Sequence, residues 1–463
     1  MLALVLAATI AATPRPLPGS HEGVFVPRMD RIGELVAFMS RAGERSAMLR
    51  PRSWFAQFHP LLYVDFTRKE SLAAAGIDPS ASVTVSLRDD GWMSCVEVSD
   101  LKTFQQRAKE RLSSLGTVWE GKLAGVDVVA AKAPDGTFRA GYAKKGKVTC
   151  AVTSSMDAKP LLDAAAGAVA TPKVSGPWSE ARRDGAMAWL ILPEGAVALR
   201  GTGDTLVAEG TTKELPAPAL VKGARSPYAT MAPVGLFLAT ATVKPSELPR
   251  AVHALIGPLA ELCAQCDRAE VSALEKTLAA ELTGNVVVDV ASAQVKQRLT
   301  TPAQRFFAVR HAWLAEVSNP KRAKEALAAV AKWPGARAEG DGYAIPLEGG
   351  EVLAGVHGQH LYLANDATVL KSVLLNVPPK PGKLAHGAEA TLDPAKASRT
   401  LAQISFFDVI GSKELAGLFA LSTEVGPLLG ITRSVTGTAD SAGSGSHRFS
   451  LTWTLKPAAA SGN

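Results

Sequence analysis

The sequence predicts an α+β fold built from two diverged repeats, each interpreted as β-α-β-β-β-α, with antiparallel sheets covered by helices and a central sheet and helix section between them. Three observations predict this fold. Residues 304–377 repeat the order of apolar runs, helix caps and turn glycines that residues 83–168 already show. The 463 residues exceed what one hydrophobic core usually supports. The segment between the repeats contains short alternating runs followed by runs with helical periodicity.

Each repeat is expected to open with a strand that leads into a capped helix. Asp100 and Asn319 are good N-cap residues, and Pro320 stands in the first turn, where its missing N–H costs nothing. Three short strands and a second helix are expected to follow in both copies. In each copy a tryptophan precedes a Glu-Val-Ser motif: Trp92 and Glu97 in the first, Trp313 and Glu316 in the second. This stretch is two residues longer in the first copy, and an even difference keeps side chains on the same face of a sheet. The predicted opening strands are 85–92 and 306–313, and the later strands lie near 126–130, 140–142 and 146–150 in the first copy and 343–347, 354–356 and 358–362 in the second.

The remaining elements follow from local patterns. A helix is predicted from Asp30, an apolar cap at 53–62, a small antiparallel sheet from strands 186–193, 196–200 and 205–209, and a loop or linker at 215–233. A strand at 235–243, helices at 245–266 and 269–282 and a strand at 285–291 lead to the second repeat. After residue 379 we expect a helix capped by Asp393, a helix at 415–425 and a hairpin of 433–439 with 448–455.

The chain is accordingly divided into seven segments. They are a signal peptide and spacer (1–18), an N-terminal helical cap (19–82), repeat 1 (83–170), central strands with a helical pair (171–303), repeat 2 (304–378), a C-terminal helix-hairpin unit (379–456) and a disordered tail (457–463).

The first residues predict export. Leu2 to Ala12 form an apolar run of signal-peptide length that is too short to span a bilayer, and cleavage is expected near Ala12. No Lys or Arg precedes the run, so the positive end of a typical signal peptide is missing. No later run approaches 18 apolar residues, so we expect no transmembrane segment in the mature chain, which should be soluble in the periplasm or cell envelope.

Four cysteines in an exported chain suggest disulfides. Cys95 and Cys150 lie on predicted strands of repeat 1, where either a bridge or two buried thiols would fit. Cys263 and Cys266 lie at the end of a helical run. A redox pair would stand at the start of a helix, where the helix N-terminus lowers the thiol pKa, so this spacing favours a structural disulfide.

Composition and motifs exclude several functional classes. The net charge of +7 is scattered, and the densest basic run, 41–52, has no aromatic stacking platform, so no nucleic-acid partner is expected. The sequence lacks Gly-x-Ser-x-Gly, His-Glu-x-x-His, a Walker loop and Gly-x-Gly-x-x-Gly, so no cofactor is expected. The pair Asp89-Asp90 is interpreted as part of a bulge or turn before Trp92 rather than as catalytic carboxylates, and the second repeat has His311-Ala312 in its place.

Three histidines are the remaining candidates for chemistry. His357 and His360 flank a two-residue turn, and His311 lies on the first strand of the same repeat, so the three could bind zinc or copper together with Asp366. The corresponding positions of repeat 1 carry no metal ligands of this kind, and residues beside a turn usually point into water. The sequence therefore favours no metal site and no catalytic residues.

One phrase of the sequence carries a resemblance. Gly76-Ile77-Asp78-Pro79 turns the chain into the first repeat, and with the helix entry at Asp100 it resembles an uncharacterised family of exported bacterial proteins, the domain of unknown function 3352. The resemblance extends to the Leu-Thr-Gly-Asn step at 282–285 and covers about residues 60–380. Its motifs are turn and packing signals, so it implies a fold and a compartment but no activity.

These observations lead us to expect a non-enzymatic binding or scaffolding protein of the periplasm or cell envelope. Its partner would be an envelope protein or an apolar ligand held in a groove or on an open sheet face. Two alternatives stay open: an envelope hydrolase or metal-dependent enzyme at the end of repeat 2 that carries His311, His357 and His360, and a lipid carrier between membranes, which would need a cavity for acyl chains.

Overall fold

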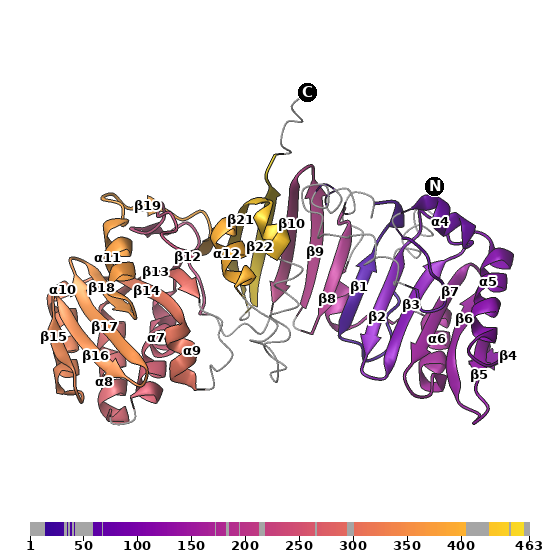
Figure 1. Cartoon of the computed structure of the whole chain (residues 1–463), viewed down its shortest axis with the longest axis horizontal. Coiled ribbons are helices and arrows are strands. Elements are labelled where there is room, and N and C mark those ends of the chain that lie inside the picture. Colours follow the sequence, from indigo (N-terminus) through magenta and orange to yellow (C-terminus); the bar gives the residue numbers. More distant parts are fainter. Residues whose placement is uncertain are drawn as a thin grey trace. The chain divides into compact units, whose positions relative to one another are not determined.

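The computed structural model describes residues 14–31, 35, 38, 41, 59–66, 68–171, 173–181, 185–193, 195–212, 218–263, 266–293, 301–403, 426–443 and 446–457. The chain divides into two compact units, 1–213 with 457–463 and 214–456. The sequence expectation of a mixed α/β fold with large antiparallel sheets is confirmed in both units (Figure 1).

Unit 1 is built on one antiparallel sheet of ten described strands. Their order across the sheet is β10-β9-β8-β1-β2-β3-β7-β6-β5-β4. The strands are β1 (Glu22–Val26), β2 (Val83–Arg88), β3 (Gly91–Glu97), β4 (Thr117–Leu123), β5 (Val126–Lys132), β6 (Phe138–Lys145), β7 (Val148–Ser154), β8 (Ala188–Leu192), β9 (Gly195–Thr202) and β10 (Thr205–Thr212). The helices are α4 (Lys69–Ala74), α5 (Leu101–Ser113) and α6 (Lys159–Ala170), with 3-10 turns η1 (Met29–Arg31) and η2 (Gly176–Glu180).

Helices cover both faces of this sheet. Alternate residues of β5 point to opposite sides, so Val129 packs in the core under α5 and Val128 packs in the core under α6. Because both faces are buried, the middle strands carry nearly continuous buried runs instead of an alternation of buried and exposed residues.

Unit 2 is built on a second antiparallel sheet of ten described strands. Their order is β22-β21-β20-β12-β13-β14-β18-β17-β16-β15. The strands are β12 (Phe237–Thr242), β13 (Leu282–Ala293), β14 (Val309–Val317), β15 (Arg337–Glu339), β16 (Gly342–Leu347), β17 (Gly350–His357), β18 (His360–Ala364), β20 (Ala388–Leu392), β21 (Thr432–Gly443) and β22 (Ser446–Leu455). A separate small pairing joins β11 (Arg225–Ser226) to β19 (Gly382–Lys383).

Helices again pack on both faces. On one side α7 (Leu248–Leu262), α8 (Arg268–Glu281) and α10 (Pro320–Leu327) share a core with Leu361 and Leu363 of β18. On the other side α11 (Ala367–Leu375) shares a core with Tyr362 and Ala364. The other helices are α9 (Pro302–Ala308) and α12 (Pro394–Ala402), with 3-10 turns η3 (Pro245–Glu247) and η4 (Ala328–Lys332).

The predicted helix caps are confirmed. Asp100 accepts a hydrogen bond from the backbone N–H of Thr103, Asn319 accepts one from Arg322, and Asp393 accepts one from Lys396. The predicted strands and helices of 235–293 and the hairpin of 433–439 with 448–455 are also present. The capping signals were therefore reliable guides to where helices begin.

Four predictions about the sheets are wrong. The expected strand 85–92 is a hairpin, because Asp89 and Asp90 form a two-residue turn between β2 and β3. The expected strand that opens at Phe306 begins as helix α9, and β14 starts only at Val309. Strands β4 and β15 were not predicted, so each segment has more strands than β-α-β-β-β-α. The strands of 186–209 do not form a small sheet of their own, because β8 pairs with β1 and joins the main sheet of unit 1.

Some predictions lie outside the described residues. They are the signal peptide, most of the helix from Asp30, residues 53–58 of the apolar cap, the helix at 415–425 and nearly all of the tail. Among the described helices, none is long and apolar enough to cross a membrane.

Candidate functional site

The structure does not bring the three candidate histidines together. His311 stands near the start of β14, and its Nδ1 lies 2.8 Å from the carbonyl oxygen of Val309. His360 pairs with Glu316, five residues further along the same strand, which is about 16 Å away at the usual rise of a strand. His311 is buried against Phe306, with ring centroids 4.9 Å apart, and burial lowers the pKa of its imidazole.

His357 and His360 face one another across the turn between β17 and β18 but have different partners. The exposed His357 lies 2.8 Å from a carboxylate oxygen of Asp341. Asp366, the fourth proposed ligand, caps α11 and forms an ion pair with Arg310. No cluster of three or more metal-binding side chains occurs among the described residues.

His360 belongs to a chain of polar side chains at one end of the unit 2 sheet. Its Nδ1 lies 2.9 Å from the hydroxyl of Tyr228, which is fully buried. Burial lowers the pKa of His360 and, with the nearby Glu316 carboxylate, raises that of Tyr228, so this hydrogen bond joins a neutral hydroxyl and a neutral imidazole. Glu316 accepts hydrogen bonds from Asn285 at 2.7 Å and from Thr283 at 2.8 Å. These groups satisfy one another and hold residues 225–228 against the sheet, as a structural clamp would.

All four cysteines form disulfides in the structure. Cys95 and Cys150 are directly opposed on β3 and β7, with their Cα atoms 4.0 Å apart. The sequence left open whether Cys95 and Cys150 form a disulfide or remain two thiols, and in the structure they form a disulfide. Cys263 follows the last residue of α7 and Cys266 precedes Asp267, the N-cap of α8, so this disulfide joins the two ends of the connection between the helices.

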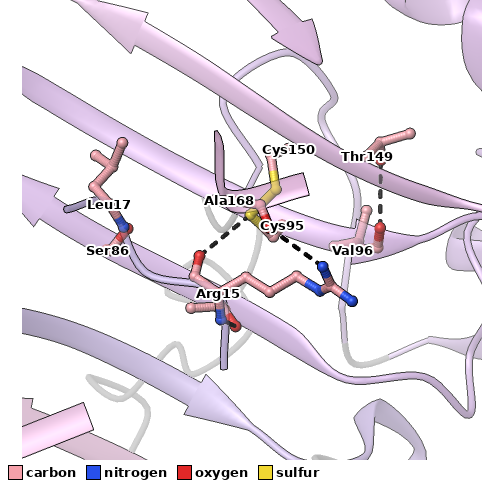
Figure 2. The surroundings of a disulfide bond; sticks show 9 residues. Arg15, Leu17, Ser86, Cys95, Val96, Thr149, Cys150 and Ala168 are labelled. Atoms are coloured by element: carbon pink, nitrogen blue, oxygen red, sulfur yellow. Dashed lines mark hydrogen bonds between the residues drawn. A yellow bond between two sulfur atoms is a disulfide. The ribbon is translucent and has the colours of Figure 1, made fainter. Parts of the chain in front are cut away.

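The segment that follows the predicted signal peptide packs against the first disulfide. Figure 2 shows Arg15 beside Cys95 and Cys150, and Leu17 beside Ser86. The backbone N–H of Leu17 donates to the Ser86 hydroxyl at 3.0 Å, and the carbonyl oxygen of Arg15 lies 3.4 Å from the sulfur of Cys95. The Arg15 guanidinium donates to the carbonyl of Ala168 at the end of α6. These contacts make the segment part of the core that α6 covers.

A hollow of about 630 Å³ lies at the strand ends of unit 1. Its walls come from the turn before β1, the Asp89-Asp90 turn and the end of β8. On adjacent strands, Leu87 of β2 pairs with Glu22 of β1, and Leu192 follows Ile191, the partner of Gly23. Both leucines are 45% exposed, which is unusual for large apolar side chains in this protein. The residues that line the hollow are Gly19, His21, Glu22, Leu87, Arg88, Asp89, Asp90 and Pro193.

Most polar groups of the hollow lack a partner. Arg88 is fixed, because it pairs with Asp90 at 2.9 Å and also reaches the carbonyl of Pro18. The other carboxylate oxygen of Asp90 is buried and accepts no hydrogen bond in the described structure. The side chains of His21, Glu22 and Asp89 form no hydrogen bond or ion pair with any described residue. The hollow therefore presents carboxylates that are available to a ligand.

A second cavity lies in unit 2 between the sheet and helices α7, α8 and α10. It is lined by apolar side chains, including Leu255, Leu274 and Trp333, and its volume is about 30 Å³. The indole N–H of Trp333 is buried there without a partner among the described residues. Since one water needs about 10–15 Å³ by this measure, the cavity has room for water but not for an acyl chain.

The sequence did not reveal the hollow in unit 1. Asp89-Asp90 was interpreted as a turn, which is correct, but Glu22 and His21 are more than 60 residues away. Nothing in the local pattern shows that β1 inserts between β2 and β8. The two acidic residues in a tight turn, where Asn-Gly or Asp-Gly is usual, were the available signal.

Comparisons with known proteins place the chain in no family. No protein-family model matches it, and no curated protein matches it. A solved structure, described as "Structure of crystal form I of TP0453", has a TM-score of 0.22 and 11% sequence identity, and the match covers 79% of this chain and 98% of that chain. A TM-score of this size supports no argument about fold or function.

Proposed function

We propose that the chain is an exported, non-enzymatic binding protein of the periplasm or cell envelope, and that it binds its partner at the hollow of unit 1. The observation that carries this proposal is the combination of a hollow of about 630 Å³ with unpaired carboxylates and the exposed Leu87 in its lining, beside which the exposed Leu192 precedes the lining residue Pro193. Ligand sites commonly enclose about 300–1,000 Å³ and place a few polar groups among apolar ones.

The proposed compartment is supported by the cysteines. Disulfides persist in oxidising compartments such as the periplasm and are rare in the cytosol. Both pairs in this chain are closed, and Cys95–Cys150 lies at the centre of a core.

We also infer that the two units are copies of one ancestral module that is larger than the predicted repeats 83–170 and 304–378. The support is topological: strand for strand, the order β10-β9-β8-β1-β2-β3-β7-β6-β5-β4 matches β22-β21-β20-β12-β13-β14-β18-β17-β16-β15, including the place of each strand along the chain. Helices α5 and α10 follow the third strand in both, and α6 and α11 follow the seventh. When the two sequences are aligned at the helix caps Asp100 and Asn319, the third strands in chain order, β3 and β14, align without a gap.

The two alternative functions have less support. A hydrolase or metal enzyme at His311, His357 and His360 would need those side chains to converge, and they have separate partners. A lipid carrier would need far more room than the cavity of about 30 Å³ beneath α7 and α8. A non-enzymatic binding protein requires neither feature.

The proposal is tested by capturing partners from the native envelope. The full chain with Glu22→Gln and Asp89→Asn together is compared with the unaltered chain after chemical cross-linking, and bound proteins are identified by mass spectrometry. Glu348→Gln is the matched control, because this exposed carboxylate lies in the turn between β16 and β17 of unit 2 and does not line the hollow.

We expect specific partners to be lost from the double variant and kept by the control. If the double variant captures the same partners as the unaltered chain, the hollow is not the binding site and the proposal fails.

A further inference from the structure

The hollow of unit 1 has a charge opposite to that of the whole chain. The protein carries a net charge of +7, whereas Glu22, Asp89 and Asp90 contribute three negative charges to the lining and Arg88 one positive charge. Arg88 pairs with Asp90, which leaves Glu22 and Asp89 without an ion-pair partner among the described residues. Concave surfaces lined by one sign of charge concentrate the electric field and attract ligands of the other sign.

The carboxylates are placed to accept hydrogen bonds. Glu22 and Asp89 are exposed and form no hydrogen bond or ion pair with any described residue. A ligand with several N–H donors, such as an ammonium or guanidinium group, would supply both hydrogen-bond donors and the opposite charge to these two carboxylates.

A row of residues at the hollow combines apolar and acidic side chains and is wider than one small ion. Leu87, Glu22 and Leu192 lie in a row across β2, β1 and β8, and with strands about 4.8 Å apart the row is about 10 Å long. The two leucines are among the few large apolar side chains that are strongly exposed in the described structure. A basic residue between apolar neighbours in an extended chain matches this leucine–carboxylate–leucine row.

We propose that the hollow binds a basic, extended segment of a partner protein, with a Lys or Arg side chain at Glu22 and Asp89 and apolar side chains on Leu87 and Leu192. This inference rests on the proposed function and specifies the chemistry of the partner. Metal binding is a different chemistry, and the described residues contain no group of metal ligands at this place.

The test uses the full chain and a fluorescein-labelled, amidated peptide Leu-Lys-Ala-Arg-Leu, with Leu-Glu-Ala-Glu-Leu as the acidic counterpart. Fluorescence anisotropy is measured at low salt and at 0.3 M salt. We expect the basic peptide to bind, the acidic one not to bind, and binding to weaken at high salt, because exposed charges are screened.

Variants then locate the binding. Glu22→Gln with Asp89→Asn is expected to weaken binding of the basic peptide about five- to tenfold, as the loss of two exposed ion pairs predicts. Leu87→Ser should weaken it as well, and Glu348→Gln should leave it unchanged. All four positions are at the surface, so thermal unfolding is measured to confirm that the variants fold.

Three results would overturn the inference. They are equal binding of the acidic peptide, equal binding by the double variant, and displacement of the basic peptide by spermidine at the same concentration as by unlabelled peptide, which would assign the site to free amines.

The two proposals can fail separately. If the double variant loses its envelope partners but no basic peptide binds, the function stands and the ligand class is wrong. If it retains its envelope partners and its affinity for the peptide is unchanged, both proposals are wrong.

Discussion

Cys95 of β3 and Cys150 of β7 stand directly opposite one another in antiparallel register and are joined by a disulfide. The residues at the matching places in unit 2 are Leu314 of β14 and Tyr362 of β18, which are also directly opposed. One unit therefore fixes this strand pair with a covalent bond, and the other fills the same place with an aromatic ring.

The two disulfides should contribute unequally to stability. Cys95–Cys150 spans 55 residues and Cys263–Cys266 spans three. In the loop-entropy model these separations correspond to about 4 and about 2 kcal/mol. We expect Cys95→Ala with Cys150→Ala to lower the midpoint of urea unfolding more than Cys263→Ala with Cys266→Ala. Equal shifts for the two double variants would show that loop closure is not the main contribution.

Gly355 should be required for full stability, because the Tyr362 ring of unit 2 occupies the space of a Cβ at this position. A Cβ on Gly355 would stand 2.2 Å from the Tyr362 hydroxyl and 2.8 Å from the Cα of Gly342. The ring would have to move, so Gly355→Ala should cost about 1–3 kcal/mol. Gly167→Ala is the control, because an added Cβ meets nothing within 4 Å there and lies in helix α6. The control Gly167→Ala should stabilise the protein by about 0.5–1 kcal/mol. If chemical unfolding shows that Gly355→Ala leaves the free energy of unfolding unchanged, the proposed packing of Tyr362 against Gly355 is wrong.

His59 should make unfolding sensitive to acid. The imidazole is buried against Phe104, its Nδ1 accepts from the backbone N–H of Leu61 and Leu62, and burial lowers its pKa to about 3. The unfolded chain binds a proton near pH 6.5, so between pH 6.5 and 3 it binds more protons than the folded chain. The contribution of the neutral His59 to the free energy of unfolding is therefore fully present above pH 6.5, and it falls by up to about 1.4 kcal/mol per pH unit below this value.

The measurement is the free energy of unfolding at pH 7.5 and 5.0 for the unaltered chain and for His59→Asn, whose amide oxygen keeps an acceptor. The variant should lose about 2 kcal/mol less than the unaltered chain between these two pH values. An identical pH dependence would mean that His59 is protonated in the folded protein.

The clamp at Tyr228 should stabilise the fold. Tyr228→Phe removes the hydrogen bond between the Tyr228 hydroxyl and His360, and it should lower the free energy of unfolding by about 1–2 kcal/mol. Tyr343→Phe in the same sheet should stay within about 0.5 kcal/mol, because Tyr343 is only partly buried and its hydroxyl has no described partner. NMR titration should show His360 titrating below pH 6.5, since burial lowers its pKa. A cost no larger than that of Tyr343→Phe would remove the clamp interpretation.

Capping signals and long periodic runs allowed most helices and many strands to be predicted from the sequence. The errors occurred where short apolar runs are ambiguous. Phe306 and Phe307 were assigned to a strand, although Thr301 and Gln304 form a capping box that marks the start of α9. Strand β15 has three exposed residues and no apolar periodicity at all.

The candidate site depended on pairings that no local pattern encodes. β1 lies between β2 and β8, so residues near 22, 87 and 192 meet only because of the order of strands in the sheet. The same reason explains why the histidines do not meet. His311 lies near the start of β14, whereas His360 lies on β18 and pairs with Glu316 near the other end of β14. Tyr228 was placed in a linker, where composition gave no sign of its burial.

The segment beside the first disulfide also has a consequence for the order of assembly. Arg15 holds the carbonyl of Ala168, 153 residues later in the chain, and Leu17 holds Ser86. The earliest described residues to emerge during synthesis thus wait for the end of α6 before they can dock. Contacts between such distant residues slow folding, because loops must close before the contacts form. The segment at Arg15 should therefore dock late, after about 170 residues have appeared, although it is synthesised before every strand of the sheet.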